Sequence, residues 1–336
     1  MSDGKPIKFG IHLNHEFEQG SDLQERIDHL VAFTRAARDL GLDSVFSMHH
    51  YLSSLATVQP LPLLARLIPE SGEMMLGNGI YLFYEHPVIL AENFASLDQL
   101  SGGRVIAGLG AGYRPNEFEA MAMERDNRVS RTFEGVELVK ELWSGEEVNH
   151  RGRYFTVEGE RCSILPAQEH LPIWLGANGE KGVRRVARSA DAWIAPPNVK
   201  AKWVKGHLGF FLDELEQMGV SAEGREMPLI RELYIGDDDE SAAAEVSDCL
   251  RDEYADYSVY GDEVEYWRTM FGELLEKAFL IGSADTVAAK IEDFADAGFN
   301  HFIFRFSWKG LPFEQSLRTI ERLATEVVPR FQEVRA

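Results

Sequence analysis

Histidines at the ends of apolar, strand-like segments are the residues best suited to chemistry in this sequence. His12 and His15 follow the first such segment, and the adjacent pair His49 and His50 follows the second, SVFSM. Imidazole exchanges protons near neutral pH and also binds metals. The pair therefore indicates either acid–base chemistry or a buried structural pair. Because side chains alternate along a strand, only one of the two can point inward.

A metal centre is the rival use of these histidines. His12, His15 and His49 together could ligate zinc. Metal-dependent hydrolase barrels, however, use an H-x-H on the first strand with a lysine, further histidines and an aspartate on later strands. Here the first strand has H-x-x-H, the fourth offers no lysine and the sixth offers no histidine. We therefore expect no metal site.

Two glycine-rich segments also follow strand-like runs. Gly108, Gly110 and Gly112 form G-x-G-x-G, which differs from the dinucleotide fingerprint G-x-G-x-x-G but lets a flat ligand approach the backbone. The second segment, Gly176–Gly182, opens a helix whose N–H groups suit a phosphate, although Asn178-Gly179 is also an ordinary turn. No G-x-S-x-G elbow or P-loop pattern occurs, so acyl-enzyme and NTPase chemistry lack support.

A repeated unit of amphipathic helix, small residue and short buried strand must position these residues. In its first copy, Ser21 begins a helix with Gln24 as its capping-box partner, and Gly41 ends it. Eight strands alternating with helices predict an α/β fold, a (β/α)8 TIM barrel, with an open doubly wound sheet as the competitor. The predicted strands are Ile7–Leu13, Ser44–Met48, Met74–Phe83, Arg104–Gly110, Ile173–Gly176, Ala192–Ala195, Leu229–Ile235 and Phe302–Phe306.

Composition narrows the classes of function. The 336 residues carry a net charge of −21 and no long basic tract, which argues against binding to nucleic acids or anionic membranes. The sequence shows neither a membrane-spanning run nor a signal peptide, and it has only two cysteines, so a cytoplasmic protein is expected. One domain over residues 1–336 is predicted, with insertions near 148–165, as a β-hairpin, and 237–280.

The negative charge is concentrated in one segment. Asp237–Trp267 contains twelve acidic residues and one basic residue and has a helical pattern. It lies between the seventh strand and the last β/α unit, where an insertion overhangs the mouth of a barrel. We expect it to form either a lid or, by preference, a solvated flank, and we expect a phosphate entering nearby to need local cations.

Several ordered segments resemble the bacterial luciferase-like, flavin-dependent monooxygenases, a superfamily that also contains enzymes using the deazaflavin F420. The resemblance covers nearly the whole chain. Its segments are FGIHLN, SVFSMHHYLSS, LGNGIYLFYEHPVILAENFASLDQLSGGRVIAGLGAGYRPNEFEAM, PIWLGANGEKGVRRVARSADAWI and IGSADTVAAKIEDFADAGFNHFIFRF. It implies a (β/α)8 barrel that binds FMN at the carboxyl ends of its strands.

The resemblance also assigns roles to residues. His49 matches the catalytic histidine of the luciferase E-H-H segment, with Met48 in place of the glutamate, and Arg305 resembles an active-site arginine of the alkanesulfonate members. Asn78-Gly79 is the expected position of a non-prolyl cis peptide beneath the flavin. Gly110 replaces a reactive cysteine, so no thiol role carries over. The remaining expected cofactor contacts are Tyr113, the phosphate-loop residues Asn178, Gly179, Glu180 and Lys181, and either Arg128 or Arg131.

The implied activity is that of a two-component FMN monooxygenase. Reduced FMN from a separate NAD(P)H:flavin reductase reacts with O2 at C4a, and the C4a-peroxyflavin oxygenates a small organic substrate in a dry cavity. Tyr81, Phe83 and Trp308 are expected to wall that cavity, and a homodimer is implied. Two alternatives stay open, an F420-dependent oxidoreductase that moves a hydride without oxygen and a non-catalytic flavin-binding subunit.

Overall fold

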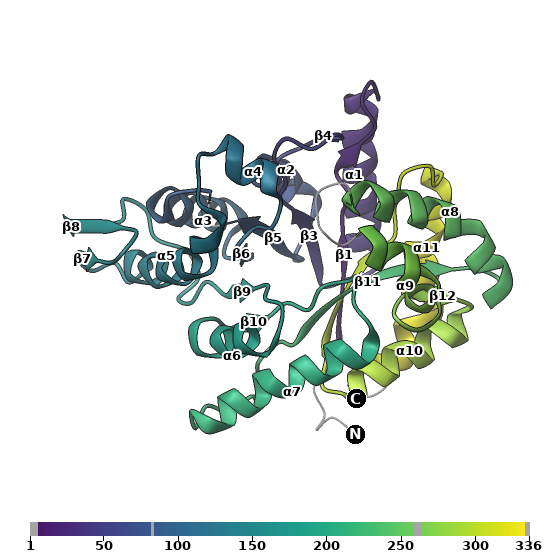
Figure 1. Cartoon of the computed structure of the whole chain (residues 1–336). Helices are drawn as coiled ribbons and strands as arrows, with labels where there is room; N and C mark the ends of the chain where they lie inside the picture. Colours follow the sequence, from purple (N-terminus) through teal and green to yellow (C-terminus); the bar gives the residue numbers. More distant parts are fainter. Residues whose placement is uncertain (1–5, 82–83, 259–263, 333–336) are drawn as a thin grey trace.

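The eight strands predicted from the sequence are all present, with small shifts at their ends (Figure 1). The computed structural model describes residues 6–81, 84–258 and 264–332. The strands are β1 (Lys8–His12), β3 (Ser44–Met48), β5 (Met75–Tyr81), β6 (Val105–Gly110), β9 (Ile173–Leu175), β10 (Ala192–Trp193), β11 (Pro228–Ile235) and β13 (His301–Arg305). Their mostly buried sequences fit strands covered on both faces, as parallel sheets require.

These strands form one curled, parallel sheet in the order β10-β9-β6-β5-β3-β1-β13-β11-β12. Strand β12 (Leu280–Gly282), which the sequence pattern did not predict, extends the sheet beyond β11. Beyond β10, Ala195 forms a single parallel bridge to Leu229 of β11. The structure thus confirms an α/β fold with a curled parallel sheet, whereas the predicted complete eight-stranded barrel is not confirmed by this single bridge.

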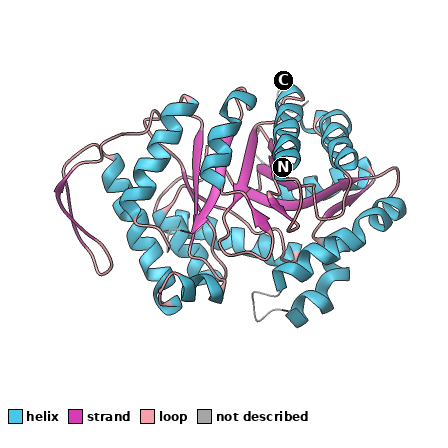
Figure 2. Ribbon diagram, turned by 90° about the horizontal axis from the view of Figure 1, so that it is seen from above, coloured by secondary structure: helices cyan, strands magenta, loops and turns pink. Residues whose placement is uncertain are grey.

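Helices surround the strands, as Figure 2 shows from above. They are α1 (Leu23–Asp39), α2 (Pro60–Leu67), α3 (Pro87–Ser101), α4 (Pro115–Ala120), α5 (Arg128–Trp143), α6 (Glu180–Ser189), α7 (Ala201–Gln217), α8 (Asp239–Ser258), α9 (Val264–Lys277), α10 (Ala284–Asp296), α11 (Phe313–Arg322) and α12 (Pro329–Gln332). The N-cap of α1 is Asp22, whose carboxylate accepts from the Gln24 and Glu25 N–H groups, so the predicted cap Ser21 is one residue early. None of these helices, within the described residues, is long and apolar enough to cross a membrane.

The space inside the curled sheet is filled by side chains from six strands. Phe46, Ile106, Trp174, Ala192, Ile230 and Ile303 form this interior cluster. The rings of Phe46 and Trp174 stack with centroids 5.3 Å apart. Gly77 must lack a side chain here, because a Cβ would lie 2.0 Å from the Phe46 ring. The cluster forms the floor beneath the carboxyl ends of the strands.

The two predicted insertions have the secondary structure expected of them. Strands β7 (Val148–Arg151) and β8 (Thr156–Glu160) pair as an antiparallel hairpin that projects from the body (Figures 1 and 2). The acidic segment forms α8 and, after residues 259–263, which lie outside the described part, α9. A separate apolar cluster joins these two helices to β12 and to Trp308. The acidic segment is therefore packed against the sheet through one face.

The amino edge of the sheet holds a buried Ser-His-Glu arrangement. The Ser44 hydroxyl lies 2.7 Å from His301 Nε2, and His301 Nδ1 lies 2.7 Å from Glu226. Ser44 is fully buried, so its hydroxyl is inaccessible to a substrate. At this edge of such folds, polar contacts serve stability rather than catalysis. We interpret this triad as a structural tie between β3, β13 and the start of β11.

Candidate active site at the carboxyl ends of the strands

Strand alternation decides which side chains enter the mouth of the curled sheet. Phe46, Ile230 and Ile303 belong to the interior cluster. Residues at even steps beyond them in the same strands face the same side, and these are His50, Glu232 and Arg305. His12 of β1 pairs in register with both Phe46 and Arg305, which places it in the same layer. The mouth thus receives charged and ionisable side chains from four neighbouring strands.

Four glycines line the opposite wall of the mouth. By the same alternation Gly79, Gly108, Gly110 and Gly176 face inward from β5, β6 and the end of β9. A Cβ built at Gly79 meets no atom within 4 Å, and one at Gly176 meets only Ile194, at 3.9 Å. At Gly108 the neighbouring backbone is already close, with Asn78 O 1.8 Å from a built Cβ. This wall can accept a flat ring against the backbone.

Arg305 lies in the mouth between two buried carboxylates. Its guanidinium is 3.2 Å from Glu232 Oε1 and 3.0 Å from Glu253 Oε1. Burial raises the pKa of Glu253 to about 7, although Arg305 opposes the shift. The Asn14 amide donates to the same Glu253 oxygen over 3.1 Å. The predicted catalytic arginine is thus already neutralised by protein groups, and its direct role in chemistry stays a prediction.

Three donors among the described residues hold Glu232. Besides Arg305, the Tyr254 hydroxyl donates over 2.7 Å and the Trp308 indole N–H over 2.6 Å. Glu253 and Tyr254 both come from α8, so the acidic segment contributes directly to the mouth rather than being only a solvated flank. Of the predicted cavity aromatics, Trp308 is fixed in this network. Phe83 and the Tyr81 side chain lie outside the described residues.

The two adjacent histidines have different surroundings. His49 is buried beside Tyr51, with ring centroids 4.3 Å apart, and burial lowers its pKa to about 3. Alternation places it on the side facing the helices. His50 enters the mouth, where Nδ1 lies 3.2 Å from Glu16 and Nε2 lies 3.2 Å from the Tyr113 hydroxyl. A catalytic role for His49 stays a prediction, and the geometry favours His50.

The first-strand histidines are neutral. Burial, helped by Arg305, lowers the pKa of His12 well below its usual range. Burial lowers the pKa of His15 to about 4, and its Nε2 accepts from the Met48 N–H over 2.9 Å. Among the described residues no group of three or more histidine, cysteine, aspartate or glutamate side chains is placed to hold a metal ion.

Asn78 and its peptide bond differ from expectation. No cis peptide occurs in the described residues, so Asn78-Gly79 is trans and the prediction of a cis bond was wrong. A trans bond lets both residues continue regular pairing with β3 and β6, and it avoids a cost of about 3 kcal/mol. Alternation turns the Asn78 side chain toward the helices. There its buried amide has no hydrogen-bond partner among the described atoms, and a cofactor contact from it stays a prediction.

The predicted phosphate loop precedes α6. Gly179 has φ +77° and forms the N-cap, leaving the first N–H groups of the helix without a side-chain cap. Asn178 and Lys181 are exposed there, and Glu180 pairs with Arg184 over 2.9 Å. These features fit a single phosphate.

The two candidate phosphate arginines are placed differently. Arg131 stacks over Phe155, with the guanidinium carbon 4.3 Å from the ring centroid. Arg128 bonds to the carbonyl of Arg125. The choice between Arg128 and Arg131 stays open.

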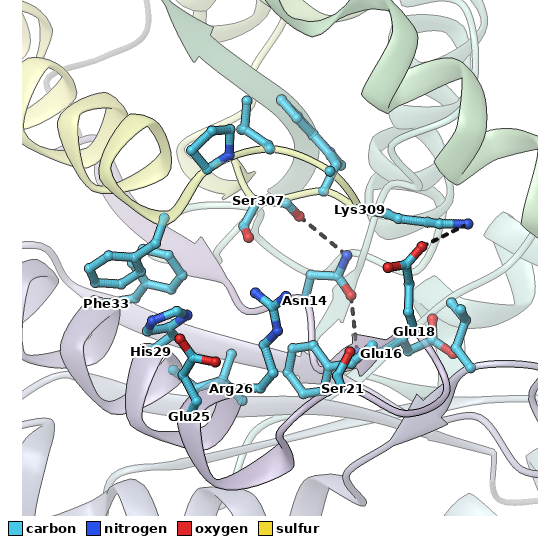
Figure 3. Close-up of a pocket in the computed structure, with 18 of the residues that line it drawn as sticks. Asn14, Glu16, Glu18, Ser21, Glu25, Arg26, His29, Phe33, Ser307 and Lys309 are labelled. Carbon is cyan, nitrogen blue, oxygen red and sulfur yellow. Dashed lines mark hydrogen bonds and ion pairs between the residues drawn. The ribbon is translucent and has the colours of Figure 1, made fainter.

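A side pocket of about 430 Å³ adjoins the mouth (Figure 3). Asn14 and Ser307, which follow β1 and β13, are two of its polar lining residues, and the Asn14 amide donates to the Ser307 carbonyl over 3.2 Å. His29 stacks on Phe313 in the opposite wall, with centroids 4.1 Å apart. Asn14 lines the pocket and also donates to Glu253, so the pocket lies next to the network around Glu253.

Sequence reasoning missed Glu16, Glu232, Glu253 and Tyr254 as site residues. A signal for Glu232 was present, because the run LIRELYI places two charged residues inside an otherwise apolar strand. Glu253 carried no such signal, since it is one of many acids in its helix. Glu16 is separated from His50 by 34 residues and has no local mark.

The chain is similar to known proteins in both sequence and fold. The model of the luciferase-like monooxygenase family matches residues 7–301. The F420-dependent hydroxymycolic acid dehydrogenase of Mycobacterium tuberculosis is 32% identical over 194 residues, covering 55% of this chain and 52% of that protein, so the chain spans about half of that relative. The oxygenase component of the flavin-dependent trigonelline monooxygenase of Acinetobacter baylyi is 23% identical over 354 residues, covering 97% and 96%.

A solved structure extends the agreement to the fold. The monooxygenase RslO1 from Streptomyces bottropensis superposes with a TM-score of 0.85 at 22% identity, covering 97% of this chain and 100% of that one. The resemblance inferred from the ordered motifs is thus confirmed by a family model that spans most of the sequence. The chain belongs to the luciferase-like monooxygenase family.

Proposed function

We propose that the chain is an oxidoreductase, specifically the FMN-dependent oxygenase of a two-component monooxygenase that acts on a small organic substrate. The observation that carries the proposal is the wall formed by Gly79, Gly108, Gly110 and Gly176, which faces the ionisable residues of the mouth. A planar isoalloxazine ring fits against such a wall. The relative from Acinetobacter baylyi, itself an oxygenase component, supports a separate flavin reductase as partner.

The residues present fit FMN. The Asn178–Lys181 loop and the uncapped start of α6 would hold one phosphate, with Lys181 and either Arg128 or Arg131 as the cations. Reduced FMN, when bound, supplies the reaction with O2. The chain's own residues orient the ring and substrate, exclude water, and hold or move protons through His50 and Tyr113.

An F420-dependent hydride transfer is the second candidate, favoured by the mycobacterial relative. F420 adds a glutamate tail with several carboxylates to its phosphate, and such a tail needs more cations than FMN does. Within the described part of α6, Arg184 and Arg188 already pair with Glu214. Lys181 and Arg185 are the other two cations of this helix, and we take so small a number as favouring the single phosphate of FMN.

Cofactor titration tests the proposal. The purified chain is titrated with reduced FMN, reduced riboflavin and F420, with binding followed by fluorescence or calorimetry. We expect FMN to bind at least 10-fold more tightly than riboflavin, and Lys181→Ala to reduce that preference. Lys202→Ala, which removes another exposed lysine, is the matched control. Tight binding of F420 without binding of FMN would overturn the FMN assignment.

Oligomeric state is measured separately. We propose a homodimer from the family resemblance, and sedimentation of the purified chain checks it. A monomer at micromolar concentration would contradict this part of the proposal without affecting the cofactor assignment.

A further inference from the structure

A continuous line of polar contacts connects four residues from three segments at the mouth. Glu16 Oε1 lies 3.2 Å from His50 Nδ1, and His50 Nε2 lies 3.2 Å from the Tyr113 hydroxyl. Arg114 Nε donates to the same hydroxyl over 3.3 Å. The line therefore runs from a carboxylate through an imidazole to a phenol beside a guanidinium.

The protonation states along this line are mutually consistent. Glu16 is an acceptor, so His50 carries its proton on Nδ1 and accepts from the phenol at Nε2. The Tyr113 oxygen in turn accepts from Arg114, which fixes the direction of its own O–H toward His50. The side chains of Glu16 and His50 are only 5% and 1% exposed. Each proton along the line thus has one preferred position.

Tyr113 is the outer end of this line. The residue is 39% exposed, while its hydroxyl is directed inward to His50 in the mouth. Burial raises the pKa of the phenol and Arg114 opposes the rise, so the hydroxyl is protonated at neutral pH and has a cation ready for the phenolate. A phenol with a base on one side and a cation on the other can both donate and accept a proton.

We propose that Tyr113 is the catalytic residue that exchanges a proton with the substrate's oxygen, and that His50 and Glu16 relay this proton. The inference rests on the proposed function and names the class of substrate as one with a reacting hydroxyl or carbonyl oxygen. When a substrate hydroxyl is deprotonated, its proton goes to Tyr113 Oη as the phenolic proton passes to His50 Nε2. The reverse transfer protonates a substrate oxygen.

This step moves protons only. No electrons leave the chain's residues, because oxidation and reduction belong to the cofactor. The imidazolium formed on His50 is stabilised by the Glu16 carboxylate, in the same way that a buried acid supports a catalytic histidine in hydrolytic triads. His50, Glu16 and Arg114 are positioning and relay residues.

The test uses Tyr113→Phe, His50→Gln and Glu16→Gln in the full chain. His170→Gln is the matched control, because His170 also pairs with a carboxylate, Asp191 at 2.8 Å, but lies at the amino edge of the sheet and is exposed. Nitrogen NMR of the protein without cofactor reports the ring protons directly. We expect His50 to be protonated on Nδ1, with the Nε2 resonance shifted in Tyr113→Phe and the Nδ1 resonance shifted in Glu16→Gln.

Kinetics then separate chemistry from binding. With the cofactor that the titration identifies and an oxygen-bearing substrate found by screening, we expect Tyr113→Phe to lower kcat by about 100-fold or more. KM and the cofactor Kd should stay within about threefold, and the solvent isotope effect should change. His50 resonances unaffected by Tyr113→Phe, or a kcat within twofold of the parent, would overturn the proposal. Failure of the proposed function would instead appear as absence of cofactor binding by the unmodified chain.

Discussion

Glu253→Gln tests how the buried carboxyl of Glu253 makes the stability of the folded chain depend on pH. The carboxyl of Glu253 is buried between Arg305 and Asn14, and burial raises its pKa from 4.5 to about 7. The folded chain therefore holds a proton on Glu253 at pH values where the unfolded chain has lost it. Because the folded state binds the extra proton, the stability of the parent protein falls as pH rises from about 4.5 to 7.

The size of this loss follows from the shift. A difference of about 2.5 between the two pKa values corresponds to about 3 kcal/mol of unfolding free energy, at 1.36 kcal/mol for each pH unit. A glutamine at this position keeps an oxygen that accepts from Arg305 and Asn14, but it does not titrate. The variant should thus gain about 3 kcal/mol relative to the parent between pH 4.5 and pH 8.

Urea unfolding followed by circular dichroism at pH 5, 6, 7 and 8 measures this difference. Taking parent minus variant at each pH cancels the other titrating groups, including His15, whose lowered pKa makes stability fall toward acid. Glu240→Gln, at an exposed position of the same helix, controls for the change in net charge. A difference between parent and Glu253→Gln that varies by less than 1 kcal/mol across this range would refute the reasoning.

Three further outcomes are expected. Gly79→Val should leave the thermal midpoint nearly unchanged, because a Cβ meets open space, but weaken flavin binding in a titration by at least 10-fold. Gly77→Val, by contrast, should lower the midpoint by many degrees, since its Cβ would lie 2.0 Å from an aromatic ring. Glu226→Gln should lower the unfolding free energy at pH 7 by about 3 kcal/mol, by the conversion used for Glu253. The pKa of Glu226 is held at about 2, mainly by His301 against the opposing effect of burial, so this contribution is present above pH 4.5 and is lost toward pH 2.

Local signals predicted most of the elements but not their long-range partners. Strands such as SVFSM depend on residues a few positions apart, so spacing alone was sufficient. The N-cap of α1 was misplaced by one residue because Ser21 and Asp22 are both good caps and only the backbone decides between them. Strand β12 was missed because three apolar residues are too short to show a period.

The location of the site was predicted from the sequence, but the contacts between its residues were not. The mouth followed from the fold, since the carboxyl ends of parallel strands gather at one edge. Whether His49 or His50 enters the mouth depends on whether strand alternation continues past Met48. The contact between His50 and Glu16 joins residues 34 positions apart, so no local pattern marks it. The role of Glu253 was invisible because burial, not residue type, distinguishes it from the other acids of α8.

Because Glu253 and Tyr254 both come from α8, one contiguous segment contributes a separate part of the site. The strands supply Arg305, Glu232 and the glycine wall, whereas one contiguous segment supplies a carboxyl and a phenol that set the charge beside them. Exchanging that segment for one of similar length that keeps the apolar contacts to β12 and Trp308 would therefore change the polarity of the mouth in one genetic event. In an enzyme built this way, substrate selectivity can diverge by recombination of the segment that contains α8 instead of by stepwise substitution in the core.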